Sequence, residues 1–253
     1  MFEKIETKRL IFKPFSTISQ EEKRIIVESW KNPFNARFNA ICNPTSTCEE
    51  IACRKEPTFS IIEKSTPSFK DTNYFRVVFD KESGELVGVC RFGMYYTYQK
   101  KEIWDFALFN VVMKHWGKGY GAEMLQGVCE FAKQKGVKYL YAGASNDNFA
   151  SYRTMIKNGF KYCGLSEGDF EYRRDLSLPS PTSEEIESEW LLHIRRYIRK
   201  FGKKRYSRLM KISSLIQEMI CKIKSGEDEK ILTEKYFEIC NKIEPFPEKC
   251  EGE

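Results

Sequence analysis

The order of apolar and polar residues along the chain predicts strands and helices in turn. Residues 6–14 alternate between apolar and polar side chains, which is typical of a strand. Ser19 and Glu22 then have the spacing of a capping box, and apolar residues recur at helical intervals over 25–30, so a helix is expected there. Residues 35–71 are rich in Cys, Thr, Ser, Pro and Asn and have weak periodicity. This composition favours an irregular insert or a pair of short helices.

Three strand patterns follow, over residues 74–79, 86–95 and 103–112, and their spacing predicts an antiparallel meander. A cluster of glycines then precedes an amphipathic helix that ends at Gly136. A short buried strand is expected over 139–144. The remaining patterns indicate a helix over 148–158 and two closing strands over 160–165 and 170–176. Antiparallel strands followed by alternating strands and helices imply a mixed, twisted α/β sheet.

The chain changes character after this sheet pattern. We expect a first domain over residues 1–176, a linker over 177–181 that contains two prolines, and an all-α extension over 182–253. The extension has three amphipathic helical patterns, the last two over about 205–224 and 229–243. The first has a capping box at Thr182 and Glu185 and apolar residues at helical spacing, which are Trp190, Leu191, Ile194, Ile198 and Phe201.

Composition narrows the class of protein. Hydrophobic residues make up 41% of the 253 residues and charged residues 31%, which are globular values, and the net charge of +6 permits an anionic partner without requiring one. The nine cysteines form no paired framework, so reduced thiols are expected. Cys42, Cys48 and Cys53 are irregularly spaced and lack a fourth ligand, and there are only two histidines, so no metal is expected. No apolar segment approaches a membrane span, which predicts a soluble, cytoplasmic protein without membrane contact.

The sequence WGKGYGA, at residues 116–122, lies between a predicted strand and a predicted helix. In this arrangement backbone amides and the helix N-terminus converge on an anion. The segment fits the pattern GxGxxA of dinucleotide-binding turns, but no acidic residue follows at the end of the next strand, and antiparallel strands precede it. A Walker A loop is excluded because no Gly-Lys pair precedes Ser or Thr. An anion site of another kind is therefore expected.

Four segments in order resemble the GNAT family of acetyl-CoA-dependent N-acetyltransferases. They are ETKRLIFKPF, LVGVCRFG, FNVVMKHWGKGYGAEML and NDNFASYRTMIKNGFKYCG, and together they cover about residues 6–176. The resemblance is closest to the branch that acetylates ribosomal-protein N-termini (RimJ/RimL-like), where Trp also occurs at the position of Trp116. It implies a GNAT-type mixed, mostly antiparallel twisted sheet flanked by helices.

The resemblance implies acetyl-CoA as the cosubstrate. The strand before the glycine loop would offer backbone groups to pantetheine, with the Val111 amide facing the thioester carbonyl, where it could stabilise a developing oxyanion. The loop amides would hold the pyrophosphate. The residues expected to bind the cofactor are Val111, Val112, Met113, Trp116, Gly117, Lys118, Gly119, Tyr120, Gly121, Ala122, Asn148 and Ser151.

Two residues are candidates for acid–base chemistry. Asp105 matches the position at which the histone-acetylating branch of the family has its glutamate base, and its shorter side chain leaves room for a water relay. The alternative is a solvated residue on a strand face. Many GNAT enzymes have a tyrosine acid at the position of Met155, which cannot donate a proton, so Ser151 is the candidate replacement. The alternative is that the Ser151 hydroxyl only forms a hydrogen bond within its own helix.

The expected function is acetyl transfer from acetyl-CoA to a primary amine, either a protein N-terminus or a small molecule, by direct attack. The alternative is a non-catalytic acyl-CoA-binding protein whose helical extension binds a protein or RNA. Residues 195–211 hold nine Lys and Arg and no acidic residue, which admits contact with RNA or the ribosome, although flanking acids favour a solvated helix face. The apolar faces of the extension must pack either on the first domain or on a second copy of the chain.

Overall fold

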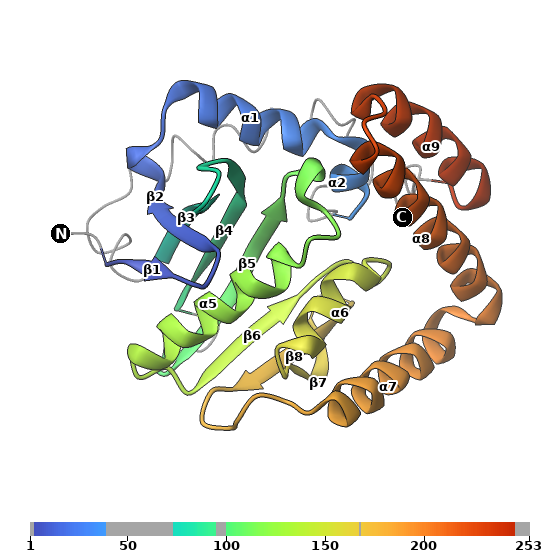
Figure 1. The fold of residues 1–253 in the computed structure, drawn as a ribbon. Helices are drawn as coiled ribbons and strands as arrows, with labels where there is room; N and C mark the ends of the chain where they lie inside the picture. The colour runs from blue at the N-terminus through green and yellow to red at the C-terminus, as the bar shows by residue number, and fades with distance from the viewer. Residues whose placement is uncertain (1–2, 39–72, 95–99, 167, 246–253) are drawn as a thin grey trace, which may run out of the picture.

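A computed structural model describes residues 3–38, 73–94, 100–166 and 168–245 of the chain. Most of the expected insert, together with Cys42, Cys48 and Cys53, lies outside these residues. The described part folds around one sheet, with helices on both of its faces and a helical arm along one side (Figure 1). No helix of the described part is long and apolar enough to cross a bilayer.

The sheet has eight strands in the order β1-β2-β3-β4-β5-β6-β8-β7, and every neighbouring pair is antiparallel except β5 and β6. This arrangement confirms the predicted mixed, mostly antiparallel sheet, including the meander of β3, β4 and β5. The strands are β1 (Ile5–Glu6), β2 (Leu10–Pro14), β3 (Asn73–Asp80), β4 (Leu86–Met94), β5 (Ile103–Val111), β6 (Tyr139–Gly143), β7 (Lys161–Ser166) and β8 (Asp169–Asp175).

The parallel pair is short. Ile103, Trp104 and Asp105 of β5 pair with residues 139–141 of β6, and the pairing stops there although β5 continues to Val111. Within the described residues, positions 106–111 of β5 therefore have β4 on one side and no strand on the other. The two strands part in the middle of the sheet, and backbone groups of β5 are left available along that edge.

The single strand expected over residues 6–14 is wrong, because the chain turns within it. β1 and β2 are separate antiparallel strands, and the Thr7 N–H donates to the Leu10 carbonyl at 2.9 Å across the turn. The polar residues of this turn, Thr7 and Arg9, both bond to Glu123, which lies more than a hundred residues further along the chain. That distant partner replaces the ladder bonds of a continuous strand.

Each face of the sheet is covered by helices that the sequence predicts. Helix α1 (Gln20–Lys31) has the expected Ser19–Glu22 capping box and packs Ile26 and Trp30 against β3 and β4 on one face. The short helix α2 (Pro33–Phe38) follows it. Helices α5 (Tyr120–Gln134) and α6 (Phe149–Lys157) pack on the opposite face, where residues such as Met124, Leu125 and Tyr152 are fully buried.

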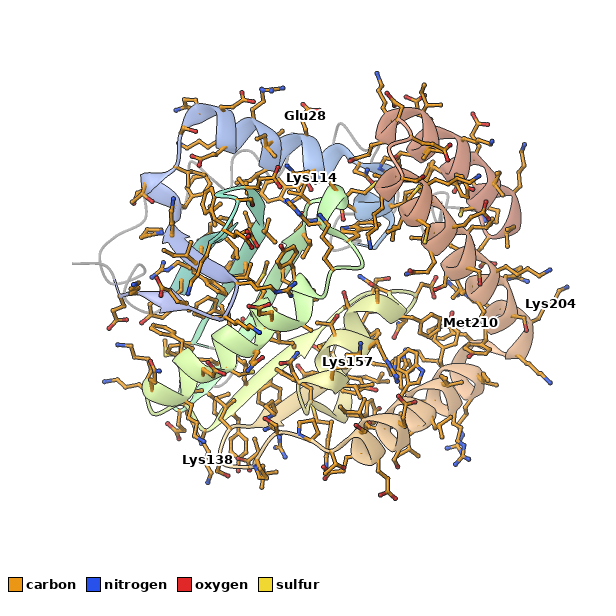
Figure 2. All side chains as sticks on the ribbon, viewed as in Figure 1. Glu28, Lys114, Lys138, Lys157, Lys204 and Met210 are labelled. Carbon is orange, nitrogen blue, oxygen red and sulfur yellow. The ribbon has the colours of Figure 1, made fainter. Side chains whose placement is uncertain are left out.

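The extension consists of helices α7 (Ser183–Phe201), α8 (Lys203–Lys224) and α9 (Glu229–Ile243), and it packs on the sheet unit of the same chain. The Thr182–Glu185 capping box begins α7 as predicted. Lys204 lies on the outer side of α8, whereas Met210 lies on its inner side (Figure 2). Side chains from the extension join the core cluster of the sheet and α5, namely Tyr197, Leu209, Ile212, Ile216, Met219, Ile220, Leu232, Tyr236 and Cys240.

The apolar face of α7 differs in part from the prediction. Leu191 is 54% exposed, while His193 and Tyr197 are fully buried. His193 stacks on Trp190 with ring centroids 5.3 Å apart, and its Nδ1 lies 2.9 Å from the Tyr172 hydroxyl. Its Nε2 has no hydrogen-bond partner in the part of the chain that the structure describes. Burial lowers the pKa of His193 to about 4, so the ring is neutral at physiological pH.

His193 should make stability depend on pH. In the unfolded chain its pKa is about 6.5, so between about pH 6.5 and 4 the unfolded state binds a proton that the folded state does not. We expect the free energy of unfolding to fall by on the order of 3 kcal/mol as the pH drops through this window. In His193→Phe that contribution should disappear, as measured by urea unfolding at several pH values. Identical pH slopes in the two proteins would contradict it.

Candidate active site

A cavity of about 480 Å³ lies where β5 and β6 part, a size typical of small-molecule sites. Its walls come from the end of β5, from the N-terminal ends of α5 and α6, and from α8. The N-terminal ends of α5 and α6 direct the positive ends of two helix dipoles toward the cavity.

The β5 wall consists of Phe109, Asn110 and Val111. The Val112 N–H donates to the Val87 carbonyl of β4 at 2.9 Å. Because N–H directions alternate along a strand, the Val111 N–H points away from β4, toward the side that β6 has left. The Val111 carbonyl accepts a hydrogen bond from Trp116 Nε1 at 2.7 Å. The β5 edge thus presents the Val111 amide on the cavity side, as the resemblance implies.

The glycine loop brings the start of α5 to the cavity. Gly117 and Gly119 have φ angles of +69° and +80°, a left-handed conformation that other residues adopt at a cost. Gly119 is the N-cap of α5, and no side chain caps this end, so the first-turn amides of Tyr120, Gly121 and Ala122 have no intrahelical partner. An anion is the group that best satisfies such a set of amides.

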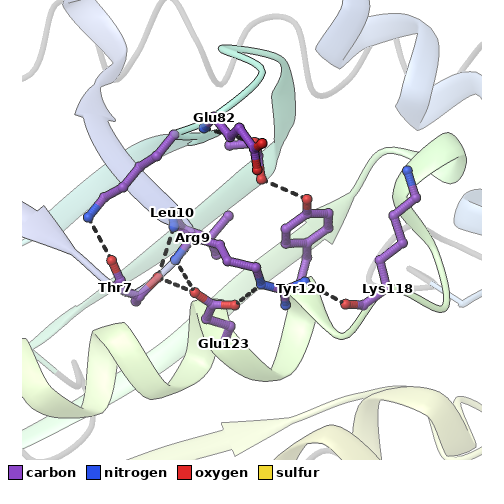
Figure 3. A network of polar contacts seen from close by, with 9 residues as sticks. Thr7, Arg9, Leu10, Glu82, Lys118, Tyr120 and Glu123 are labelled. Carbon is purple, nitrogen blue, oxygen red and sulfur yellow. Dashed lines mark hydrogen bonds and ion pairs between the residues drawn. The ribbon is translucent and has the colours of Figure 1, made fainter.

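Polar contacts from the β1–β2 turn hold the loop in place (Figure 3). The Glu123 carboxylate accepts from Thr7 Oγ1 at 2.6 Å, from the Arg9 N–H at 2.7 Å and from Arg9 Nε at 2.6 Å. Arg9 Nη1 in turn donates to the Lys118 carbonyl at 3.0 Å. Glu123 therefore couples the first turn of α5 to the β1–β2 turn and, through Arg9, to the loop itself.

Tyr120 anchors the same loop from the other side. Its hydroxyl donates to Asp80 Oδ2 at 2.7 Å, and the Arg9 guanidinium lies 4.4 Å from the centre of its ring. Hydrogen bonds from the Ser83 N–H and the Tyr120 hydroxyl lower the pKa of Asp80 to about 2, so this acceptor stays ionised at physiological pH. The loop amides are thus positioned before any ligand arrives, which reduces the entropy cost of binding.

Helix α6 begins beside the cavity. Asn148 caps it by accepting the Ser151 N–H at 3.1 Å, and both residues line the cavity. Met155, at the position where the family commonly has tyrosine, is fully buried in the core. The hydroxyl of the nearby Tyr152 donates to backbone carbonyls, including that of Phe170 at 3.1 Å. Neither side chain lines the cavity, whereas Ser151 does.

The cavity collects most of the residues expected to bind the cofactor. Val112, Met113 and Lys118 do not line it. Met113 is buried, with its Sδ 3.3 Å from Thr233 Oγ1 of α9, and Val112 packs toward α1. The residues of the expected set that line the cavity are Val111, Trp116, Gly117, Gly119, Tyr120, Gly121, Ala122, Asn148 and Ser151.

Asp105 lies outside the cavity, at the last paired position of β5 and β6. Alternation along β5 places its half-buried side chain on the face opposite the buried Trp104 and Phe106. Burial raises the pKa of Asp105 to about 6; the positive charge of Arg91 opposes this shift and the negative charge of Glu171 adds to it. Asp105 is therefore a carboxylate whose protonation changes near neutral pH.

Several cavity residues carry no signal in the sequence. His115 is almost fully buried; its Nε2 donates to the Leu86 carbonyl at 3.1 Å, and its Nδ1 has no partner among the described residues. Asn110 accepts a hydrogen bond from Ser29 at 3.0 Å. Helix α8 contributes an entire wall, which no motif indicated; its cavity residues are Leu209, Ile212, Ser213, Ile216, Gln217 and Ile220. Within residues 3–38, 73–94, 100–166 and 168–245, no cluster of His, Cys, Asp or Glu could hold a metal ion.

Removing the Glu123 carboxylate should weaken the attachment of α5 to the β1–β2 turn. Glu123→Ala leaves the Thr7 hydroxyl, the Arg9 N–H and the guanidinium without their shared acceptor. We expect a loss of about 2 kcal/mol in the free energy of unfolding, measured with urea. Glu130→Ala is the matched control: it lies on the same helix, is exposed, and should change stability by less than about 0.5 kcal/mol. Equal losses in the two variants would contradict the role given to Glu123.

Solved structures, two of them N-acetyltransferases, have the same fold. A domain from Methanocaldococcus jannaschii DSM 2661 is 16% identical, with a TM-score of 0.52 over 66% of this chain and 98% of its own. A GCN5-related N-acetyltransferase from Brucella melitensis is 15% identical, with a TM-score of 0.52 over 77% of this chain and 83% of its own. The PaiA N-acetyltransferase from Thermoplasma acidophilum, solved with coenzyme A, is 16% identical, with a TM-score of 0.50 over 66% and 98%.

No curated protein matches the chain. A family model does: the acetyltransferase (GNAT) domain matches residues 9–161, more than half of the sequence. The match ends before α7, so the three helices of the extension lie beyond the family domain. It confirms the predicted fold and the predicted class of enzyme, an acyltransferase. The chain belongs to the GNAT family of acetyltransferases.

Proposed function

We propose that this protein transfers an acetyl group from acetyl-CoA to a primary amine. The observation that carries the proposal is the unpaired edge of β5, which faces a cavity bounded by two helix N-termini. An extended chain of amides can pair with such an edge as an additional strand does, and a pyrophosphate can bind the helix amides. Pantetheine and pyrophosphate are the two parts of coenzyme A that require these groups.

The residues of the cavity fit this cofactor. The Gly117–Gly121 segment and the start of α5 offer amides for the pyrophosphate. The Val111 N–H points toward the cavity, where it could donate to a thioester carbonyl. Bound acetyl-CoA supplies an activated acetyl group. A fixed amide stabilises the negative charge that develops on a carbonyl oxygen under attack by a nucleophile. The Thermoplasma structure of the same fold holds coenzyme A, which supports the proposal at the level of the fold.

Asp105 is the proposed base. An amine is mostly protonated at neutral pH and must lose a proton before it can attack. The raised pKa of Asp105, about 6, leaves the carboxylate ionised at neutral pH but basic enough to accept that proton through a water molecule. Ser151, in the cavity wall, is the proposed donor toward the departing thiolate. A thiol with a pKa of about 8.5 needs little assistance, so the buried Met155 does not argue against turnover.

We favour a protein N-terminus as the acceptor over a small-molecule amine. Support comes from the sequence: the segments 6–15 and 30–38, together with Trp116 and Ser151, resemble the ribosomal-protein branch. Contact with RNA through residues 195–211 is less favoured, because three of the arginines are already paired within the chain. Arg196 pairs with Glu189 at 2.7 Å, Arg205 with Asp147 at 2.8 Å, and Arg208 with Glu244.

Binding and turnover separate this function from its alternative, an acyl-CoA-binding protein without activity. We expect millimolar acetyl-CoA to raise the unfolding temperature, since a ligand at 100 times its Kd stabilises by about 2.7 kcal/mol. Release of coenzyme A should then accelerate in a panel of peptides with free N-termini more than in one of small amines. Binding without amine-dependent release would favour the alternative, and no thermal shift would exclude both functions.

The pH profile tests Asp105. In the native enzyme kcat/KM should fall as the pH drops below about 6, because Asp105 becomes protonated. Asp105→Asn should reduce kcat by about 100-fold or more and remove this acidic limb. Glu171→Gln removes a negative charge that raises the pKa of Asp105, so it should move the limb to lower pH. An unchanged rate and profile in Asp105→Asn would exclude Asp105 as the base.

A further inference from the structure

Helix α8 forms one side of the cavity although it lies outside the family domain. Leu209, Ile212, Ile216 and Ile220 are buried in the shared core and also line the cavity. Ser213 and Gln217, one helical turn apart, are exposed and line it as well. Along the cavity, α8 therefore has a buried apolar row with a polar row beside it.

The position of α8 is determined by contacts on both sides of the cavity. At one end Asp147, just before α6, accepts hydrogen bonds from the Tyr197 hydroxyl at 2.7 Å and from Arg205 at 2.8 Å. At the other end α9, which packs on α8, contacts Met113 through Thr233. Asp147 itself lines the cavity. The extension is thus attached both to the loop before α6 and to the segment that follows β5.

The last turn of α8 brings a cation to the glycine loop. A Cβ placed on Gly117 would lie 3.1 Å from Lys224 Nζ and 3.6 Å from a methyl group of Ile220. No salt bridge joins Lys224 to a carboxylate of the part of the chain that the structure describes. Neither Lys224 nor Lys118, the lysine that the resemblance implies in cofactor binding, lines the cavity itself. Lys224 is therefore a positive charge beside the amides that would hold a pyrophosphate.

We propose that α8 is part of the cofactor site: Ser213 and Gln217 face bound acyl-CoA, and Lys224 pairs with its pyrophosphate. The proposal rests on the proposed function, since it names additional residues for the same ligand. In this proposal the extension, which lies outside the family domain, takes part in binding the cofactor. An anion beside the loop gains both the helix amides and a nearby ammonium group.

Substitutions at two adjacent serines of α8 test whether this helix forms a wall of the cofactor site. Ser213→Trp places an indole in the cavity and should lower the affinity for coenzyme A at least about tenfold, measured by titration calorimetry. Ser214→Trp is the matched control, since Ser214 is also exposed but does not line the cavity. Both variants should keep the native unfolding temperature. Native affinity in Ser213→Trp, or equal losses in the two variants, would overturn the assignment.

Substitutions at two lysines of α8 test whether the positive charge of Lys224 contributes to cofactor binding. Lys224→Gln should weaken binding of coenzyme A and of dephospho-CoA equally, by about three- to tenfold at low salt, and the effect should shrink at 0.5 M salt. Lys211→Gln makes the same charge change at an exposed position outside the cavity and should leave both affinities unchanged. Loss for coenzyme A alone would place Lys224 at another phosphate and overturn the pyrophosphate assignment.

The same titrations separate this inference from the function on which it rests. If the native protein binds no coenzyme A, both fail. If the native protein binds and the Ser213 and Lys224 variants bind equally well, only the role of α8 fails. If affinity falls in these two variants and not in their controls, α8 belongs to the cofactor site.

Discussion

Backbone pairing between β5 and β6 ends at Asp105, and the site depends on this limit. Had β6 continued alongside β5 in the same register, the outward N–H groups of Phe109 and Val111 would be paired and no ligand could reach them. Since they part, the sheet core continues on either side while its centre has an unpaired edge. The loops that follow β5 and β6 then lie on opposite sides of one opening, and each leads into a helix N-terminus that faces it.

An opening of this kind needs rigid borders, and the chain supplies them from distant segments. Glu123 and Tyr120 attach the start of α5 to the β1–β2 turn and to the end of β3, so the glycine loop is held from two directions. Asn148 caps α6, and Asp147, in the loop before α6, connects that loop to the extension. The preorganised amides are therefore supported by short charged or polar contacts rather than by the loop's own sequence, in which glycines offer little conformational restraint.

The sequence predicts local features better than the contacts among distant ones. Capping boxes at Ser19 and Thr182 are local hydrogen-bond patterns, so they appear where expected. The β1–β2 turn is missed because its polar residues bond to Glu123, far along the chain. The inner face of α7 is only partly predicted. The hydroxyl of the buried Tyr197 bonds to Asp147, which lies 50 residues earlier in the chain and comes close only in the folded protein. The glycine loop is recognisable by its motif, whereas α8 joins the cavity through tertiary packing, which no short motif records.

The dependence of the cavity on α8 also has a consequence during synthesis. A chain emerges from the ribosome N-terminus first, at about 5–20 residues per second, so the sheet and the glycine loop are available before α8. Residues from Leu209 onward must follow before the apolar side of the cavity is covered. The nascent protein therefore passes through a stage in which its ligand pocket is open along one side. The cavity therefore takes its final form only once α8 has been synthesised and has packed on the sheet unit.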